Sequence, residues 1–388
     1  MATRIPIRFL QPLCGILMGV CMPPSSQAEV ALMRVPDGGI QPQVITDAAG
    51  TVHLLYFKGD PSGGDLFYVH RRRNSPGFSR PIRVNSQPGS SIAIGTIRGG
   101  QLALGQAGRI HVAWNGHAPR EGTFMEAPML YTRLNDAGTG FEPERDVIQN
   151  ARGLDGGGSL AADSKGTVLV TWHAPRPGNT RGEAGRSVFI ARSTDGGRTF
   201  GPEQPVPRLD TGACGCCGMK AFLDSHGTLF LSYRGANESG SRDQVLVAGP
   251  DGGLELKVLL EDPWKISACP MSSTSWTEAG RRILGAWETR GKVCWAAFGP
   301  TGAIADPPVT PPTQGRNPKH PIAVGNSRGE TLLAWTEGTG WARGGDVAWQ
   351  RFDAQGKPMG EKGVAPGVPT WSLVAAMTDP DGRFVLIY

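Results

Sequence analysis

A hairpin pattern that recurs along the chain limits the folds available to it. A glycine is followed six residues later by Trp or Tyr, with alternating apolar residues between them. By subtraction of the glycine positions, the pattern returns every 49 to 61 residues. Alternation with period two indicates half-buried β-strands, and a repeat of this length is typical of propeller blades. The copies are Gly50–Tyr56, Gly108–Trp114, Gly166–Trp172, Gly227–Tyr233, Gly329–Trp335 and Gly382–Tyr388, with a looser copy at Gly280–Trp287.

Between hairpins the chain has room for two more strands. In the third repeat these strands lie at 187–193 and 200–206, on either side of a turn. The pattern therefore predicts an all-β fold, a β-propeller of four-stranded blades. Seven blades are favoured and six are the alternative. The last hairpin lacks following residues, so we expect Val30–Val35 to pair with it and close the ring.

The turn at 193–200 reads Ser-Thr-Asp-Gly-Gly-Arg-Thr-Phe, which has the form Ser-x-Asp-x-Gly-x-Thr-aromatic. Asp can accept bonds from backbone N–H groups in such a turn, and glycine allows positive φ. The octapeptide resembles the Asp-box of the sialidase-like (BNR/Asp-box repeat) β-propeller superfamily. The strings Cys214-Gly215-Cys216-Cys217 and Cys269-Pro270-Met271 resemble more closely a group of secreted bacterial sialidase-like proteins without an assigned reaction.

The resemblance implies the fold and leaves the activity open, because one fold supports many functions. Sialidases grip a carboxylate with three arginines and use a Tyr nucleophile backed by Glu, with an Asp acid/base. They also carry a Phe-Arg-Ile-Pro-like string near the mature N-terminus, whose nearest copy here, Arg4-Ile5-Pro6, lies in the predicted signal segment and cannot serve. An exo-α-sialidase-type glycoside hydrolase is therefore an alternative function, and whether the protein is an enzyme is not determined.

Residues 1–28 have the form of a signal peptide, with Arg4 and Arg8 before a short apolar stretch and small residues at 26–28. We expect export to the periplasm or beyond after cleavage near Ala28, leaving one propeller domain at 29–388. No later segment is apolar for eighteen residues, so no membrane span is predicted. The small remaining positive charge does not indicate nucleic-acid binding. The sequence does not determine the oligomeric state.

Five of the seven cysteines follow the signal segment, and four of them gather in two strings. Cys214, Cys216 and Cys217 precede the inner strand of the fourth blade, and Cys269 precedes that of the fifth. Equivalent positions in adjacent blades should approach each other near the axis. Two interpretations stay open: disulfides, the usual state in an exported protein, or a soft metal such as copper or zinc held by thiolates. Cys294, on a third strand, is expected in the core.

The loops on the cysteine-bearing face also carry polar residues suited to a glycan or a small anionic ligand. Arginine forks hold carboxylates, and histidine supplies further hydrogen bonds. The phrase His-Ala-Pro-Arg occurs twice, at 117–120 and 173–176. The candidate ligand-binding residues are His117, Arg120, Arg152, Asp155, His173, Arg176, Arg234, Arg242, Asp243 and His320.

Overall fold

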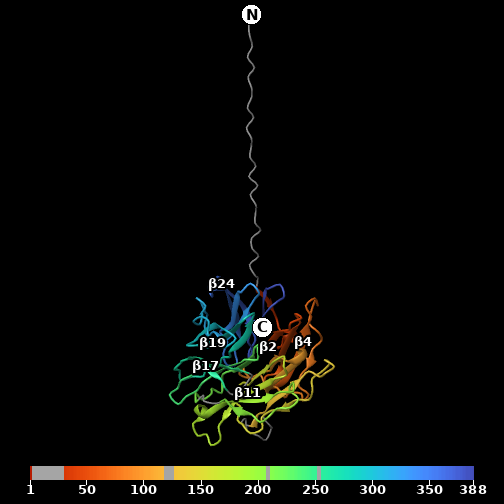
Figure 1. Cartoon of the computed structure of the whole chain (residues 1–388), viewed down its shortest axis with the longest axis vertical. Coiled ribbons are helices and arrows are strands. Elements are labelled where there is room, and N and C mark those ends of the chain that lie inside the picture. The colour runs from red at the N-terminus through yellow and green to blue at the C-terminus, as the bar shows by residue number, and fades with distance from the viewer. Residues whose placement is uncertain (2–29, 118–125, 207–209, 251–254) are drawn as a thin grey trace.

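Seven β-sheets follow one another around a ring in the computed structural model, in the order of the sequence (Figure 1). The structure describes residues 1, 30–117, 126–206, 210–250 and 255–388. The predicted signal segment, and with it export, falls outside these ranges and stays a prediction. Within them, no helix is long and apolar enough to cross a bilayer.

The first four sheets have four antiparallel strands each, in sequence order from the axis outward. Blade 1 contains β2 (Ile40–Thr46), β3 (Val52–Asp60), β4 (Gly63–Arg71) and β5 (Ile82–Arg83). Blade 2 contains β6 (Gln101–Leu104), β7 (Ile110–Asn115), β8 (Met129–Arg133) and β9 (Arg145–Asp146). Blade 3 contains β10 (Ser159–Ala162), β11 (Val168–Pro175), β12 (Arg186–Ser193) and β13 (Gln204–Pro205). Blade 4 contains β14 (Lys220–Leu223), β15 (Leu229–Arg234), β16 (Gln244–Gly249) and β17 (Lys257–Asp262).

The remaining three sheets complete the ring. Blade 5 contains β18 (Ser275–Ala279), β19 (Arg282–Thr289) and β20 (Lys292–Phe298), and two isolated bridges, Trp295–Val309 and Phe298–Ile304, stand in place of a fourth strand. Blade 6 contains β21 (Lys319–Gly325), β22 (Thr331–Glu337), β23 (Gly345–Phe352) and β24 (Pro358–Val368). Blade 7 contains β25 (Ala375–Thr378) and β26 (Phe384–Ile387), and it is completed by β1 (Val30–Met33).

The ring is closed by β1, which runs parallel to β26 with Val30 opposite Phe384. This confirms the predicted closure by the segment that begins at Val30 and the preference for seven blades. The innermost strands β2, β6, β10, β14, β18, β21 and β25 each contact the next around the axis, and β25 contacts β2. The fold is therefore a closed all-β propeller.

Apolar side chains are buried between blades, with one cluster at each of the seven blade-to-blade interfaces. The hairpin aromatics lie in these clusters: Trp114, Trp172 and Trp335 have no exposed surface. A face of a single blade cannot bury itself, so each blade depends on its neighbours for a core. Cys294 is buried in the cluster between blades 4 and 5, as predicted.

The turn at 193–200 joins β12 to β13, and its hydrogen bonds explain its sequence. The Asp195 carboxylate accepts bonds from the Thr199 backbone N–H at 2.9 Å and the Ser193 hydroxyl at 2.7 Å. Gly196 and Gly197 have φ of 69° and 75°, which a Cβ would strain. This turn belongs to the face formed by the first-to-second and third-to-fourth turns of each blade. The opposite face, which we call the axial face, carries the second-to-third loops and the links between blades.

Candidate functional site

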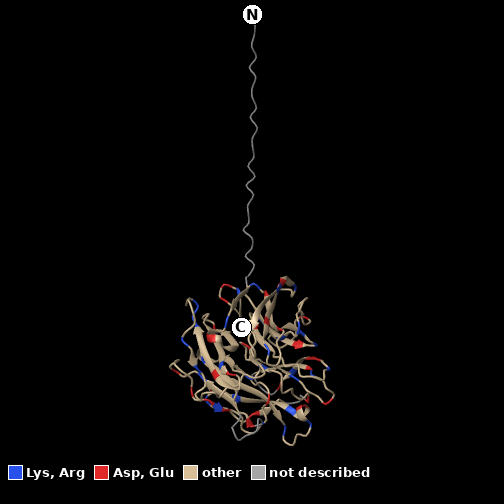
Figure 2. Ribbon diagram, turned by 180° about the vertical axis from the view of Figure 1, so that it is seen from behind, with Lys and Arg blue, Asp and Glu red and all other residues tan. Residues whose placement is uncertain are grey.

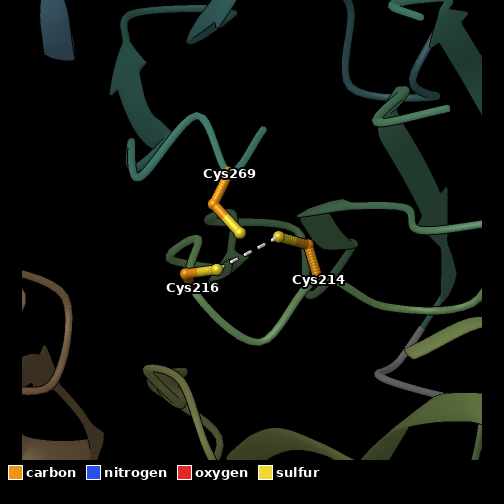
Figure 3. Close-up of side chains that lie close together, drawn as sticks. All are labelled: Cys214, Cys216 and Cys269. Carbon is orange, nitrogen blue, oxygen red and sulfur yellow. Dashed lines mark hydrogen bonds between the residues drawn. The ribbon is translucent and has the colours of Figure 1, made fainter. Parts of the chain in front are cut away.

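Four cysteines from two links meet on the axial face. Cys214, Cys216 and Cys217 lie in the link from blade 3 to blade 4, and Cys269 lies in the link from blade 4 to blade 5. The sulfurs of Cys214, Cys216 and Cys269 all lie within 4.8 Å of one another and point toward a common space (Figure 3). Cys214 Sγ is 3.9 Å from Cys216 Sγ and 3.7 Å from Cys217 Sγ. All five described cysteines are free thiols, so the disulfide alternative is not observed in this structure.

The backbone explains why these sulfurs converge. The Cys214 N–H donates to the Arg234 carbonyl at 2.9 Å, which fixes the first link on the end of β15. The Gly218 N–H donates to the Ser272 carbonyl at 3.0 Å, which joins the two cysteine-bearing links to each other. Cys214 and Cys217 are buried, whereas Cys269 is exposed. The cluster therefore opens to solvent on the Cys269 side.

Charged groups surround the sulfur cluster. Glu183 accepts a bond from the Gly215 N–H at 2.5 Å and pairs with Arg242 at 2.8 Å, so it connects the cysteine loop to a guanidinium. Hydrogen bonds from the Cys214 thiol, outweighing desolvation, lower the pKa values of Cys217 and Cys269 to about 6. Hydrogen bonding with Cys216, then with Cys217 and Cys269, together with burial, raises the pKa of Cys214. The cluster is thus arranged to hold negative charge on sulfur.

A second polar network lies next to this loop. Arg98 pairs with Asp155 at 3.2 Å and also donates to the Asp155 carbonyl at 2.7 Å. Arg186 approaches the same carboxylate at 3.7 Å and contacts His173 Nδ1 at 3.0 Å. Burial, with the charge of Arg186, lowers the pKa of His173 to about 3, so this imidazole is neutral. A Cβ on Gly215 would lie 2.4 Å from Asp155 Oδ2, which shows how closely the network and the cysteine loop pack.

An open depression lies on the axial face, where the start of β21 meets the link that leads into β6 and the loop between β22 and β23. Trp341 and Trp371 form an edge-to-face pair in its wall, with ring centroids 4.8 Å apart. Trp341 is 58% exposed, which is unusual for so large an apolar side chain. Arg343 also lines the depression and forms no ion pair with any described residue. The lining residues are Gly95, Thr96, Met271, Lys319, His320, Thr339, Gly340, Trp341, Arg343, Trp371 and Ser372.

The backbone around the depression is strained. Four of its lining residues other than glycine have positive φ: Thr96 at 68°, Met271 at 50°, His320 at 53° and Trp371 at 62°. For a β-branched or bulky residue this region costs energy and is held only where surrounding contacts require it. Such strain gathers at binding sites more often than elsewhere. It therefore marks this depression as a candidate site.

The predicted ligand-binding residues divide into those that the structure brings near these features and those that it does not. Asp155 and His173 share one network, Arg234 and Arg242 lie beside the cysteines, and His320 lines the depression. Arg152 instead pairs with Asp146 in its own blade.

Four predicted residues remain. Arg176 donates to the hydroxyl of Ser187 in its own blade. Asp243 accepts a bond from the Trp264 N–H at 2.8 Å and lines a separate hollow with Asp210 and Glu261. His117 is exposed at the end of β7, and Arg120 lies outside the described residues.

Two groups were missed by the sequence analysis. Arg186 lies at the start of β12, where a strand pattern gives no indication that the side chain turns toward Asp155. Lys220 begins β14 and extends across the axis, where its ammonium donates to Gln101 of blade 2 at 3.0 Å. Burial lowers the pKa of Lys220 to about 8. A polar first residue on an inner strand could have indicated an axial position for Lys220.

The tyrosines lie away from these features. All five are at most 5% exposed, and none lines the depression. The hydroxyl groups of Tyr68 and Tyr131 contact His53 and His111 at 2.7 Å within their own blades. Tyr233 contacts Thr211 at 2.8 Å. Basic and acidic residues are interspersed over the ribbon in the view of Figure 2, so local pairs decide the electrostatics of each site.

Comparison with known proteins gives the fold and no close relative. No protein-family model matches the sequence, and no functionally curated protein matches it. Among solved structures, an α-L-arabinanase of Penicillium chrysogenum complexed with arabinobiose has a TM-score of 0.52 at 13% identity, covering 86% of this chain and 99% of that one.

A Trypanosoma rangeli sialidase in complex with the inhibitor DANA has a TM-score of 0.51 at 11% identity. That match covers 81% of this chain but only 57% of the sialidase. Polysaccharide lyase Uly1 has a TM-score of 0.47 at 12% identity, covering 82% of this chain and 78% of that one. At these identities the likeness establishes the fold, and the chain has a sialidase-like β-propeller fold.

Proposed function

We propose that the protein recognises a saccharide that carries a carboxylate, bound in the depression on the axial face. The observation that carries the proposal is the exposed ring of Trp341 beside the guanidinium of Arg343, which has no ion-pair partner in the part of the chain that the structure describes. An exposed indole offers a flat apolar surface for the face of a sugar ring. A guanidinium offers a two-pronged donor for a carboxylate, and this pairing is stronger than a neutral hydrogen bond.

The neighbouring side chains suit an uncharged, hydroxyl-rich part of the ligand. The lining also includes three hydroxyl-bearing residues, Thr96, Thr339 and Ser372. Burial, followed by the charge of Lys319, lowers the pKa of His320 to about 3, so its ring is a neutral hydrogen-bonding group. The likeness to an arabinanase complexed with arabinobiose and to a sialidase in complex with the inhibitor DANA supports a carbohydrate ligand.

Binding rather than sialidase hydrolysis is favoured by the position of the tyrosines. A Tyr nucleophile must reach the sugar, whereas all five tyrosine side chains of this chain are buried and none lines the depression. We expect export, as the signal segment predicts, to bring the protein to extracellular or periplasmic glycans.

The proposal is tested by calorimetric titration with acidic oligosaccharides and with neutral ones of the same length. We expect Arg343→Ala to weaken binding of the acidic set by about 10- to 100-fold, the range for a charge-assisted hydrogen bond. Trp341→Ala should weaken both sets. Arg80→Ala is the matched control, because Arg80 is an exposed arginine between β4 and β5 on the opposite face. Equal binding of acidic sugars by the wild type and Arg343→Ala would overturn the proposal.

A further inference from the structure

Among the described residues, one group of side chains is close enough together to hold a metal ion, and its three ligand atoms are all sulfurs. Cys214, Cys216 and Cys269 come from two separate links, and their sulfurs lie within 4.8 Å of one another. The side chains of this group point inward from both links, as Figure 3 shows. Such convergence of residues 53 to 55 positions apart requires the fold, so it is not a property of one flexible loop.

The sulfur spacing fits a metal ion better than it fits a disulfide. Metal–sulfur bonds of about 2.3 Å place neighbouring sulfurs about 3.8 Å apart around a tetrahedral ion and about 4.0 Å apart around a trigonal one. Cys214 Sγ and Cys216 Sγ are 3.9 Å apart. A disulfide brings the sulfurs to about 2.05 Å. The three sulfurs are therefore spaced for coordination of one ion and lie farther apart than an S–S bond.

We propose that Cys214, Cys216 and Cys269 bind one Cu(I) ion in trigonal coordination. Thiolates are soft ligands, and a site with sulfur alone selects soft ions such as Cu(I). A closed structural zinc site needs a fourth protein ligand. The fourth sulfur nearby, that of Cys217, lies 3.7 Å from Cys214 but is not part of the group that shares one space.

The surroundings of the sulfurs suit a coordinated ion. Glu183 accepts the Gly215 N–H and so holds the loop that carries Cys214 and Cys216 in place, as an outer-shell partner does. Arg242 pairs with Glu183 and also lies close enough to the cysteines to interact with their charge. Its Nε is buried without a hydrogen-bond partner among the described residues. A negatively charged copper–thiolate centre would add a second anionic group beside this guanidinium, whose only ion pair among the described residues is with Glu183.

The access route is through Cys269, the exposed member of the three. A free Cu(I) ion, or a molecule that delivers Cu(I), can reach this sulfur first. The less exposed Cys214 and Cys216 then complete the coordination. The site uses neither Trp341 nor Arg343, so it stands apart from the saccharide proposal. Failure of either proposal leaves the other unaffected.

The test is a Cu(I) titration of the full, reduced protein against a chromophoric Cu(I) chelator, with native mass spectrometry to count bound ions. We expect one Cu(I) per chain for the wild type. Cys269→Ala should weaken Cu(I) binding at least 100-fold; because Cys269 is exposed, this variant should keep its fold. Cys216→Ser should have the same effect. Cys294→Ala is the control, because this thiol lies in the core away from the cluster and should leave Cu(I) binding unchanged.

A second measurement guards against misfolding of a variant. A ligand that binds only the native state raises the melting temperature by mass action, so Cu(I) should raise it for the wild type and Cys294→Ala but not for Cys269→Ala. The proposal is overturned if no Cu(I) binds or if Cys269→Ala binds it as tightly as the wild type. It is also overturned if zinc competes Cu(I) off the site, or if the purified protein has lost two hydrogens through a disulfide within the cluster.

Discussion

The packing of the second link against the third gives a prediction that tests the axial architecture directly. A Cβ on Gly156 would lie 2.1 Å from the carbonyl oxygen of Gly215 and 2.9 Å from His173 Nε2. Ordinary contact begins near 3.4 Å, so Gly156→Ala forces the cysteine-bearing link to retreat by more than about 1 Å. The φ of Gly156 is not left-handed, so the cost comes from the clash alone. Overpacking of this kind costs about 1–3 kcal/mol.

The assay is urea unfolding at equilibrium, followed by tryptophan fluorescence. Gly156→Ala should lower the unfolding midpoint with an unchanged slope, because stability changes while the surface exposed on unfolding does not. Gly77→Ala is the control, since a Cβ there meets no atom within 4 Å and its φ is also outside the left-handed region. We expect the control to stay within about 0.5 kcal/mol of the wild type. If Gly156→Ala behaved like the control, the close approach of the two links would be wrong.

Three further predictions concern stability. Asp195→Ala should lower the free energy of unfolding in urea by about 1–3 kcal/mol, through loss of the hydrogen bonds from Thr199 and Ser193. Although burial raises the Asp195 pKa, these bonds lower it further, so the folded-state pKa lies below the unfolded one. The stability that Asp195 contributes should therefore be lost as pH falls below about 4. Burial lowers the pKa of Lys220 from 10.5 to about 8, so the unfolded chain binds more protons between these values; stability should therefore rise with pH in that window, and Lys220→Met should remove the rise. Deletion of residues 30–33 should lower the melting temperature and promote association on size-exclusion chromatography, because it leaves β26 with an unpaired edge.

The blades and the meeting of the cysteines could be predicted from the sequence because both depend on position within a repeat. A residue just before an inner strand must lie near the axis whichever blade it belongs to, so Cys214 and Cys269 were placed together without coordinates. The same reasoning placed Asp155 and His320 on the axial face. In a repeat protein, the position of a residue within its repeat therefore predicts where it lies in the fold.

Side-chain direction within a link could not be predicted in this way. Arg152 lies three residues from Asp155 but turns outward to Asp146, whereas Arg186 turns inward from a strand. These choices depend on which oppositely charged group lies near each guanidinium in the folded chain, and the strand pattern does not indicate it. The positive φ values of Thr96 and Trp371 also lack a sequence signal, because residues other than glycine enter that region only under tertiary contacts.

The link from blade 4 to blade 5 connects the sulfur cluster to the depression. Cys269 belongs to the cluster, and two residues later Met271 lines the depression with a strained φ of 50°. Between them, the Pro270 carbonyl accepts a bond from Lys319, which also lines the depression and pairs with the buried Glu288. The sulfur cluster and the depression are therefore joined by a link of three residues and by the hydrogen bond from Lys319. An effect of Cys269→Ala on saccharide binding would test whether this link couples the two sites, since they share no ligand-binding side chain.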